Sequence, residues 1–247
     1  MAGTLLCGVM HLVWAIAGAA AGLLAGGALR GTVFRHSVAS GDPARDSCPR
    51  CAASVRRLVA VRCGHCRASL GVPLVLELTT AAVLALLVGR FGGQPEILAL
   101  GFFGVLGVAL AAIDIAVKRL PDNLTLPAYP ILIVLLAVAA ISGHDLSALG
   151  RALLGGLALS GAFLALALAR PGQLGGGDVK LAGLAGLALG WLGWPALISG
   201  AALGFVLSAI VSLVLLAARR TTLRSAICFG PFLVGGALLA VLASGTR

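Results

Sequence analysis

The sequence predicts an all-α membrane protein: a polytopic bundle of about eight transmembrane helices with a small cytoplasmic zinc-binding loop. Of the 247 residues, 60% are hydrophobic and only 11% are charged, with a mean hydropathy of +1.09. Soluble domains average about 25% charged residues, so a chain this apolar needs a bilayer as its solvent. Glycine is abundant, with 35 residues, and small residues let membrane helices pack closely.

The first predicted element is a transmembrane helix at the N-terminus. Residues 1–29 contain no Asp, Glu, Lys or Arg, and a basic segment starts at Arg30. A secretory signal peptide would carry positive charge before a short apolar core, whereas here the charge follows a long one. We therefore expect a retained helix over about residues 5–29.

Residues 72–247 are predicted to form seven further transmembrane helices, since each span needs roughly 20 apolar residues. The uncharged run from Leu181 to Ala218 is long enough for two spans, and the Trp-rich turn at 190–195 suits a membrane interface. The expected spans are 72–89, 96–114, 124–142, 148–169, 178–194, 197–218 and 226–244. The expected domains are thus a first transmembrane helix (1–29), a cytoplasmic zinc loop (30–71) and a seven-helix membrane domain (72–247).

The distribution of positive charge predicts the orientation, because cytoplasmic loops collect Lys and Arg. With the N-terminus outside, only Arg90, Arg151 and Arg247 of the 18 basic residues lie outside. The other fifteen lie in cytoplasmic segments: Arg30, Arg35, Arg45, Arg50, Arg56, Arg57, Arg62, Arg67, Lys118, Arg119, Arg170, Lys180, Arg219, Arg220 and Arg224. The net charge of +10 therefore reflects the membrane topology, and we expect no nucleic-acid partner. The alternative is a basic tail that binds DNA.

Four cysteines in the polar loop have the spacing of a metal site. Cys48 and Cys51 form one C-x-x-C pair, and Cys63 and Cys66 form a second, with eleven residues between the pairs. Two such turns can complete a tetrahedral site, and disulfides rarely persist in the cytoplasm. Four thiolates leave no open position for water, so we expect a structural Zn ion that folds a loop without a core of its own. His65 is not expected to be a ligand.

Two aspartates are expected at one membrane face, where charges usually mark function. Asp114 ends the third expected helix as it reaches the cytoplasm, and Asp178 starts the sixth as it leaves. Two carboxylates that share a proton can activate water for attack on a peptide carbonyl. The glycines at 175–177 let backbone or substrate approach closely. The alternatives are a helix N-cap for Asp178 and an ion pair with Lys118 for Asp114.

Two other acidic residues, Asp122 and Glu77, lie near or within the expected helices. Asp122, which follows Pro121, is expected to be a turn or capping residue before the fourth helix. Glu77 falls within the second expected span, where an acid is costly and usually has a function. The pattern suggests only that Glu77 positions another group.

The Asp segments carry a resemblance to a known family. The segment Gly175-Gly176-Gly177-Asp178-Val179-Lys180 resembles the G-x-G-D motif of the type IV prepilin peptidases, a family of membrane aspartic proteases. Residues Asp114 to Asn123 resemble the other catalytic segment of that family, in which an Asp precedes a short basic loop and Pro-Asp or Pro-Asn. Smaller similarities occur at Pro73 to Leu78 and at Phe229 to Leu233.

This resemblance implies a peptidase of the bacterial inner (cytoplasmic) membrane that removes the basic leader from type IV prepilins or pilin-like secretion subunits. Asp114 and Asp178 would be the catalytic pair, supported by the motif residues Gly175, Gly176, Gly177 and Lys180. The cut would occur at the cytoplasmic face. Many members also N-methylate the new terminus with S-adenosylmethionine, but the stretch between the cysteine pairs is shorter here than in the longer members. Methylation is therefore left open.

Two other classes of function compete with a peptidase. One is a transporter whose intramembrane carboxylates bind cations; such proteins often contain internal repeats, and no repeat is visible between the halves of this sequence. The other is an inactive pilus-assembly scaffold organised by its zinc loop. The sequence does not identify the pilin substrate or the oligomeric state.

Overall fold

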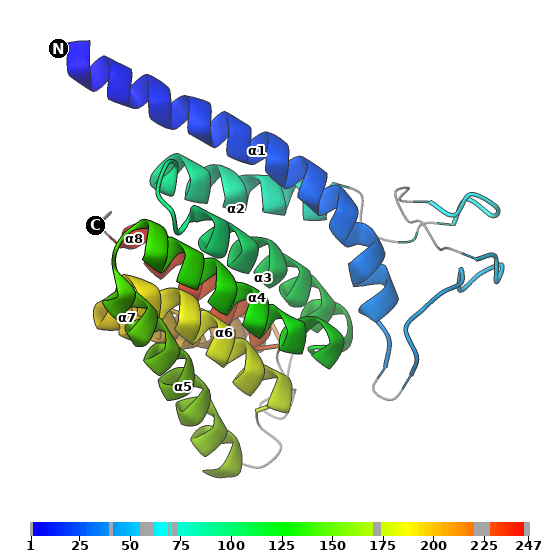
Figure 1. Ribbon diagram of the computed structural model, residues 1–247. Coiled ribbons are helices and arrows are strands. Elements are labelled where there is room, and N and C mark those ends of the chain that lie inside the picture. The colour runs from blue at the N-terminus through cyan, green and yellow to red at the C-terminus, as the bar shows by residue number, and fades with distance from the viewer. Residues whose placement is uncertain are drawn as a thin grey trace. The chain divides into compact units, whose positions relative to one another are not determined.

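The computed structural model describes residues 2–39, 42–54, 62–68, 70, 74–169, 174–219 and 228–244, with side chains from residue 8 onward. Within these ranges it is helical without strands, apart from one isolated bridge between Ser47 and Ser54, which confirms the predicted all-α class (Figure 1). The eight helices are α1 (Ala2–His36), α2 (Val75–Phe91), α3 (Ile97–Val117), α4 (Asp122–Ser142), α5 (Leu146–Ala169), α6 (Gly176–Leu192), α7 (Trp194–Ala217) and α8 (Gly230–Ala243). Seven residues named in the sequence predictions lie outside the described residues: Arg56, Arg57, Pro73, Arg170, Arg220, Arg224 and Arg247.

Five of these helices, α1, α3, α4, α5 and α7, are long and apolar enough to cross a membrane. Their mean hydropathies lie between 1.9 and 2.4. The described parts of α2 and α6 have 17 residues each and α8 has 14, which is shorter than the roughly 20 residues of a full span. All eight predicted helices are thus present, and five have the length of a membrane span.

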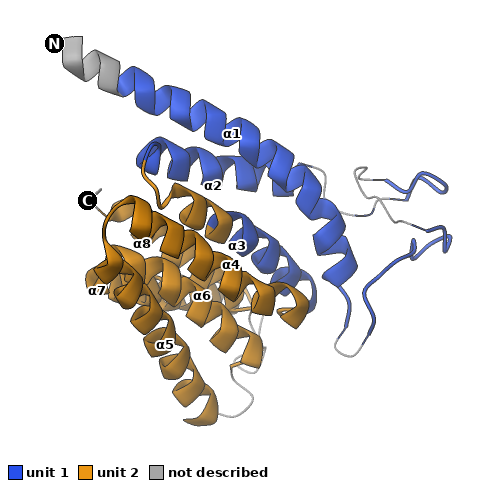
Figure 2. Cartoon of the chain, in the orientation of Figure 1, with its two compact units in different colours: residues 1–93, 104–119 blue, residues 94–103, 120–247 orange. Residues whose placement is uncertain are grey.

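The chain divides into two compact units (Figure 2). Unit 1 contains residues 1–93 and 104–119, and unit 2 contains residues 94–103 and 120–247. Helix α3 contributes its first turns to unit 2 and the remainder to unit 1.

In unit 1, α1 and α2 lie side by side (Figure 1). Their backbones meet at Gly18, Gly22 and Gly26, which recur every fourth residue along one face of α1. A Cβ atom on Gly22 would lie 2.4 Å from the Cα atom of Ala81, so no side chain fits there. This close approach is the usual way in which membrane helices associate.

A buried ion pair also joins α1 to α2. The Arg30 guanidinium contacts the carboxylate of Glu77, and Glu77 is only 6% exposed. Because a single buried charge is costly, pairing is the usual condition for its burial. Arg30 is therefore the group that Glu77 positions, which the sequence alone did not reveal.

Helix α1 continues through His36 instead of ending near residue 29 as expected. The returning loop stabilises its last turn, because the Arg45 N–H donates to the carbonyl of Arg35 at 2.9 Å. The Arg45 guanidinium also lies 5.1 Å from the centre of the buried Phe34 ring. The first basic residues therefore mark where the apolar segment ends, and the helix extends beyond them.

In unit 2, α6 contacts α4, α5, α7 and α8. Every residue from Leu181 to Trp191 is buried, and a helix that is apolar on all sides belongs in the centre of a bundle. Helices α5 and α6 touch through their backbones, because a Cβ atom on Gly186 would lie 2.4 Å from the carbonyl oxygen of Gly155. Helix α6 thus places Asp178, in its first turn, at one end of the core of unit 2.

Replacement of Gly22 by Leu should separate α1 from α2, because the new side chain would collide with the backbone at Ala81. Overpacking of this kind typically costs about 1–3 kcal/mol. We expect a lower thermal unfolding midpoint for Gly22→Leu in detergent. Gly27→Leu is the matched control, since nothing lies within 4 Å of a Cβ atom there. Equal midpoints for the two variants would contradict this packing.

Candidate functional site

The four predicted metal ligands lie together in unit 1, in the loop that follows α1. The Sγ atoms of Cys48, Cys51, Cys63 and Cys66 all lie within 4.8 Å of one another. The Cys48–Cys66 and Cys51–Cys63 sulfur distances are both 3.7 Å. A tetrahedral site with Zn–S bonds of about 2.3 Å separates its sulfurs by about 3.8 Å. The four thiols can therefore hold one tetrahedral metal ion.

The two cysteine pairs are two copies of one turn. In each copy the residue after the second Cys, Ala52 or Arg67, has a positive φ, 56° and 54° respectively. The N–H of that residue donates to the carbonyl of the first Cys of its pair at 2.9 Å. Each turn thus directs two thiols to the same point. His65 is exposed and lies outside this cluster of four, as expected.

The protonation of the thiols also fits metal binding. Backbone N–H groups of Cys66 and His65 hold the pKa of the Cys63 thiol at about 6, and backbone hydrogen bonding likewise lowers the pKa of Cys48. The pKa of Cys51 is raised to about 12: a backbone N–H acts to lower it, but desolvation and the neighbouring thiols outweigh that effect. Metals bind thiolates, so an ion would displace the protons that remain on the cluster.

Asp178 lies at the N-terminus of α6 in unit 2. Gly175 is the N-cap residue, and Asp178 occupies the third helical position. The Gly175 N–H donates to Oδ2 of Asp178 at 3.1 Å, and the Asp178 N–H donates to the Gly175 carbonyl at 3.0 Å. Asp178 therefore caps α6 from within its first turn instead of being the N-cap itself. A carboxylate there is favoured by the positive end of the helix dipole.

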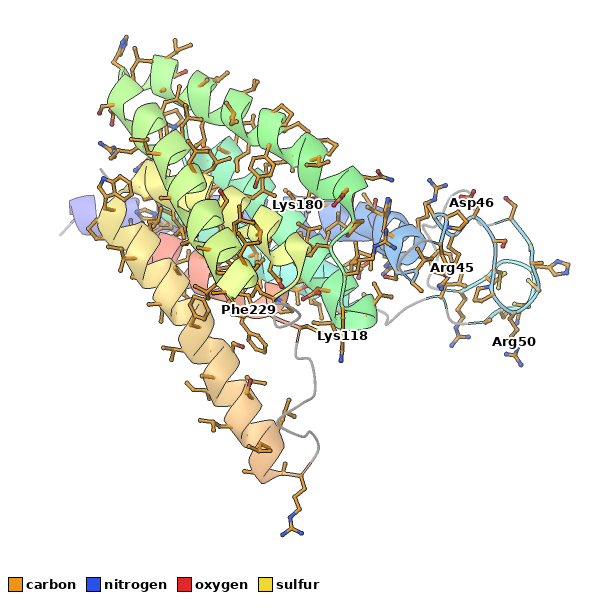
Figure 3. All side chains as sticks on the ribbon, turned by 90° about the horizontal axis from the view of Figure 1, so that it is seen from below. Arg45, Asp46, Arg50, Lys118, Lys180 and Phe229 are labelled. Carbon is orange, nitrogen blue, oxygen red and sulfur yellow. The ribbon has the colours of Figure 1, made fainter. Side chains whose placement is uncertain are left out.

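Lys180, which Figure 3 labels, lies on α6 two residues after Asp178. It contacts α4. Its Nζ atom lies 2.6 Å from Oδ1 of Asp122, and its carbonyl accepts a hydrogen bond of 2.7 Å from the Tyr129 hydroxyl. Asp122 is the first residue of α4, and no side chain caps that helix, whose N-cap is Pro121. The expected capping role of Asp122 was wrong, because its carboxylate points to Lys180 instead.

Asp114 lies in the last turn of α3, in unit 1, and is 5% exposed. The Lys118 N–H donates to the Asp114 carbonyl at 2.7 Å, and the positive φ of Lys118, 52°, ends the helix. The Arg119 guanidinium donates to the carbonyl of Ala39 at 2.7 Å, which ties the end of α3 to the residues after α1. Asp114 and Asp178 belong to different units, and their pairing stays a prediction.

Tyr129 is the functional candidate that the sequence analysis missed. It is the only Tyr in the chain, and it lies in α4 between two prolines, Pro127 and Pro130. Its rarity was the only signal available. Only the packing of α4 against α6 reveals that its hydroxyl meets the start of the helix that carries Asp178.

Comparison with known proteins gives consistent matches. Residues 100–218 match the sequence profile described as the type IV leader peptidase family. A prepilin leader peptidase/N-methyltransferase of Burkholderia pseudomallei is 33% identical over 212 residues, which cover 78% of this chain and 65% of that protein. The Pseudomonas aeruginosa protein of the same name is 31% identical over 218 residues, covering 79% and 70%. The corresponding Pseudomonas putida protein is 32% identical over 184 residues, covering 73% and 62%.

The chain therefore spans between 62% and 70% of the length of these relatives. No solved structure matches the chain significantly.

We expect the purified protein to contain about one metal ion per chain, because its four clustered thiols fit one tetrahedral site. Elemental analysis should show loss of the ion in a Cys51→Ser, Cys66→Ser double variant. Cys228→Ser is the control, since Cys228 lies far along the chain beside α8 and outside the cluster. An unchanged metal content in the double variant would show that the ion is bound elsewhere.

Proposed function

Because the chain belongs to the type IV leader peptidase family, we propose that it removes the basic leader from type IV prepilins or pilin-like secretion subunits. The observation that carries this proposal is the placement of Asp178. The G-x-G-D motif forms the N-terminus of the central helix of unit 2, and a backbone N–H orients the carboxylate. A plain membrane anchor has no need of such an arrangement.

We propose that Asp114 and Asp178 act together on the scissile peptide bond. Asp178, at the positive end of a helix dipole, acts as the base that takes a proton from the attacking water. Asp114, in its protonated form, donates to the carbonyl oxygen, so that negative charge does not build up there. When the C–N bond of the resulting tetrahedral intermediate breaks, Asp178 gives its proton to the leaving amine, and Asp114 recovers a proton from a hydroxyl of the intermediate. Gly175, Gly176 and Gly177 leave room for the substrate backbone beside Asp178.

The membrane setting supports a location in the bacterial inner membrane. The basic residues predict that the N-terminus lies outside and that the catalytic pair faces the cytoplasm. In the substrates of this family, a basic leader precedes an apolar helix. A site at the cytoplasmic face would therefore lie beside the junction between the leader and that helix. Residues 72–247 would form the peptidase domain, joined to the first transmembrane helix by the cysteine loop.

The metal proposed for the cysteine cluster is zinc, in a structural role. Four thiolates suit Zn, which accepts tetrahedral sulfur coordination and leaves no position for a catalytic water when all four ligands are Cys. The two turns have few apolar side chains with which to build a core, and a bound ion would supply the folding free energy. Zinc would therefore hold the cytoplasmic loop in shape and take no part in peptide hydrolysis.

N-methylation of the new terminus is the second candidate activity. The relatives compared above are named for both peptidase and N-methyltransferase activities. S-adenosylmethionine would supply the methyl group: the terminal amine attacks the methyl carbon, the C–S bond breaks, and the amine loses a proton. This chain covers only part of those relatives, so its methyl transfer must be tested separately from cleavage.

The central test incubates membranes that contain the protein with a candidate prepilin and follows the shortened product. Asp114→Asn and Asp178→Asn should each lower the cleavage rate by at least about 100-fold, since each variant removes an acid–base group. Asp46→Asn, in the exposed cysteine loop, is the matched control and should cleave normally. Normal cleavage by both catalytic variants would exclude the dyad. Ion flux that both variants abolish, without any proteolysis, would instead favour a transporter.

Methyl transfer should be measured on a pilin that lacks its leader, with labelled S-adenosylmethionine as donor. If the chain has both activities, Asp178→Asn should still label this pre-cleaved pilin but should fail to label the full prepilin, which has no free mature terminus. Absence of label on the pre-cleaved pilin with the wild-type protein would exclude methylation and leave cleavage unaffected.

A further inference from the structure

We infer that Asp122, Tyr129 and Lys180 form a latch between α4 and α6 that positions Asp178 for catalysis. The inference rests on the proposed catalytic role of Asp178, to which it adds three positioning residues. All four side chains belong to unit 2. Asp122 and Tyr129 each contact Lys180, and none of the three needs to touch the substrate.

The first part of the latch is the ion pair between helices. Lys180 and Asp122 are 58 residues apart in sequence, and their charged atoms lie 2.6 Å apart. Both side chains are partly exposed, at 34% and 57%. Exposed ion pairs add little to stability because water and salt screen them. The pair therefore has more effect on the orientation of α6 relative to α4 than on the free energy of unfolding.

The second part of the latch fixes the backbone of Lys180. The Tyr129 hydroxyl donates to the Lys180 carbonyl at 2.7 Å, so that residue is held through both its side chain and its main chain. The hydroxyl fits against α6 only because Gly183 has no side chain: a Cβ atom there would lie 2.0 Å from the hydroxyl oxygen. Lys180 follows Asp178 by two residues, so these bonds act within the same turn of helix.

A third contact lies on the other side of Asp178. Leu120, just before α4, is buried and packs against Gly177, where a Cβ atom would lie 2.8 Å from the Leu120 Cβ atom. Asp178 is thus bracketed by two residues, Gly177 and Lys180, that both meet the start of α4. Together these contacts hold the first turn of α6, and with it the Asp178 carboxylate, against α4 and the residue that precedes it.

Such positioning matters because acid–base groups must be held within about 0.5 Å of their productive geometry. A misplacement of 1 Å can lower a rate by about 100-fold. If the latch positions Asp178, its loss should reduce kcat and leave the thermal midpoint unchanged. A role limited to stability would lower the midpoint instead.

The test uses the full-length protein reconstituted in vesicles, with a prepilin as substrate, and measures kcat, KM and the thermal midpoint. Asp122→Asn and Lys180→Met should each lower kcat by about tenfold, with KM and the midpoint unchanged. The exchanged pair, Asp122→Lys with Lys180→Asp, should recover most of the lost kcat. Tyr129→Phe, which removes only the hydroxyl, should lower kcat by a few fold without a change in charge.

Asp145→Asn is the matched control. It removes a charge from the Asp145–Arg151 ion pair of unit 2, and Asn is as good a helix cap as Asp, so the α5 N-terminus is preserved. This control should retain full kcat. The latch is refuted if kcat is unchanged in Asp122→Asn, Lys180→Met and Tyr129→Phe, if kcat falls only together with the midpoint, or if the exchanged pair recovers nothing.

These results are separable from those of the dyad test. If Asp178→Asn is inactive and the latch variants are fully active, the latch fails and the proposed peptidase mechanism stands. If Asp178→Asn still cleaves normally, the proposed mechanism fails, and the latch has no catalytic group to position.

Discussion

Both units of this protein depend on close contacts between helix backbones. These contacts occur where a glycine leaves no side chain between the two helices. Gly22 on α1 meets Ala81 on α2, and Gly155 on α5 meets Gly186 on α6, each at a distance that excludes a Cβ atom. In a bilayer, lipid is as apolar as Leu, so burial of apolar side chains gives helices little reason to associate. Dispersion between closely fitted backbones takes that role. Glycine therefore allows the close approach of α1 to α2 and of α5 to α6.

Two ion pairs between helices reflect a second constraint, since a charge near a membrane helix usually has a partner. Glu77 contacts Arg30 across the α1–α2 interface, and Lys180 contacts Asp122 across the α4–α6 interface. Both pairs join helices that already pack against each other. Within each unit, the ion pair thus adds a directed polar contact to an existing helix–helix interface.

Much of this structure could be predicted from local sequence patterns. The eight helices follow from hydropathy, and the cysteine cluster follows from the C-x-x-C spacing, because both depend only on residues near one another in the chain. The end of α1 could not be placed, since basic residues mark the limit of the apolar segment and do not stop a helix. Asp122 was taken for a cap because its partner, Lys180, is distant in sequence. Tyr129 had no sequence signal beyond being the one Tyr of the chain, because its role depends on which helix packs against α4.

The left-handed backbone at Ala52 and Arg67 has a consequence for metal exchange. A non-glycine residue in that conformation costs about 1 kcal/mol, and each of the two cysteine turns contains one. A bound ion would hold both turns in this conformation, so its binding would have to offset this cost. The cost therefore subtracts from the binding free energy, by about fivefold in affinity for each turn and about thirtyfold for both. Zinc in this cluster would thus bind less tightly than in a loop whose two turns carried no such strain.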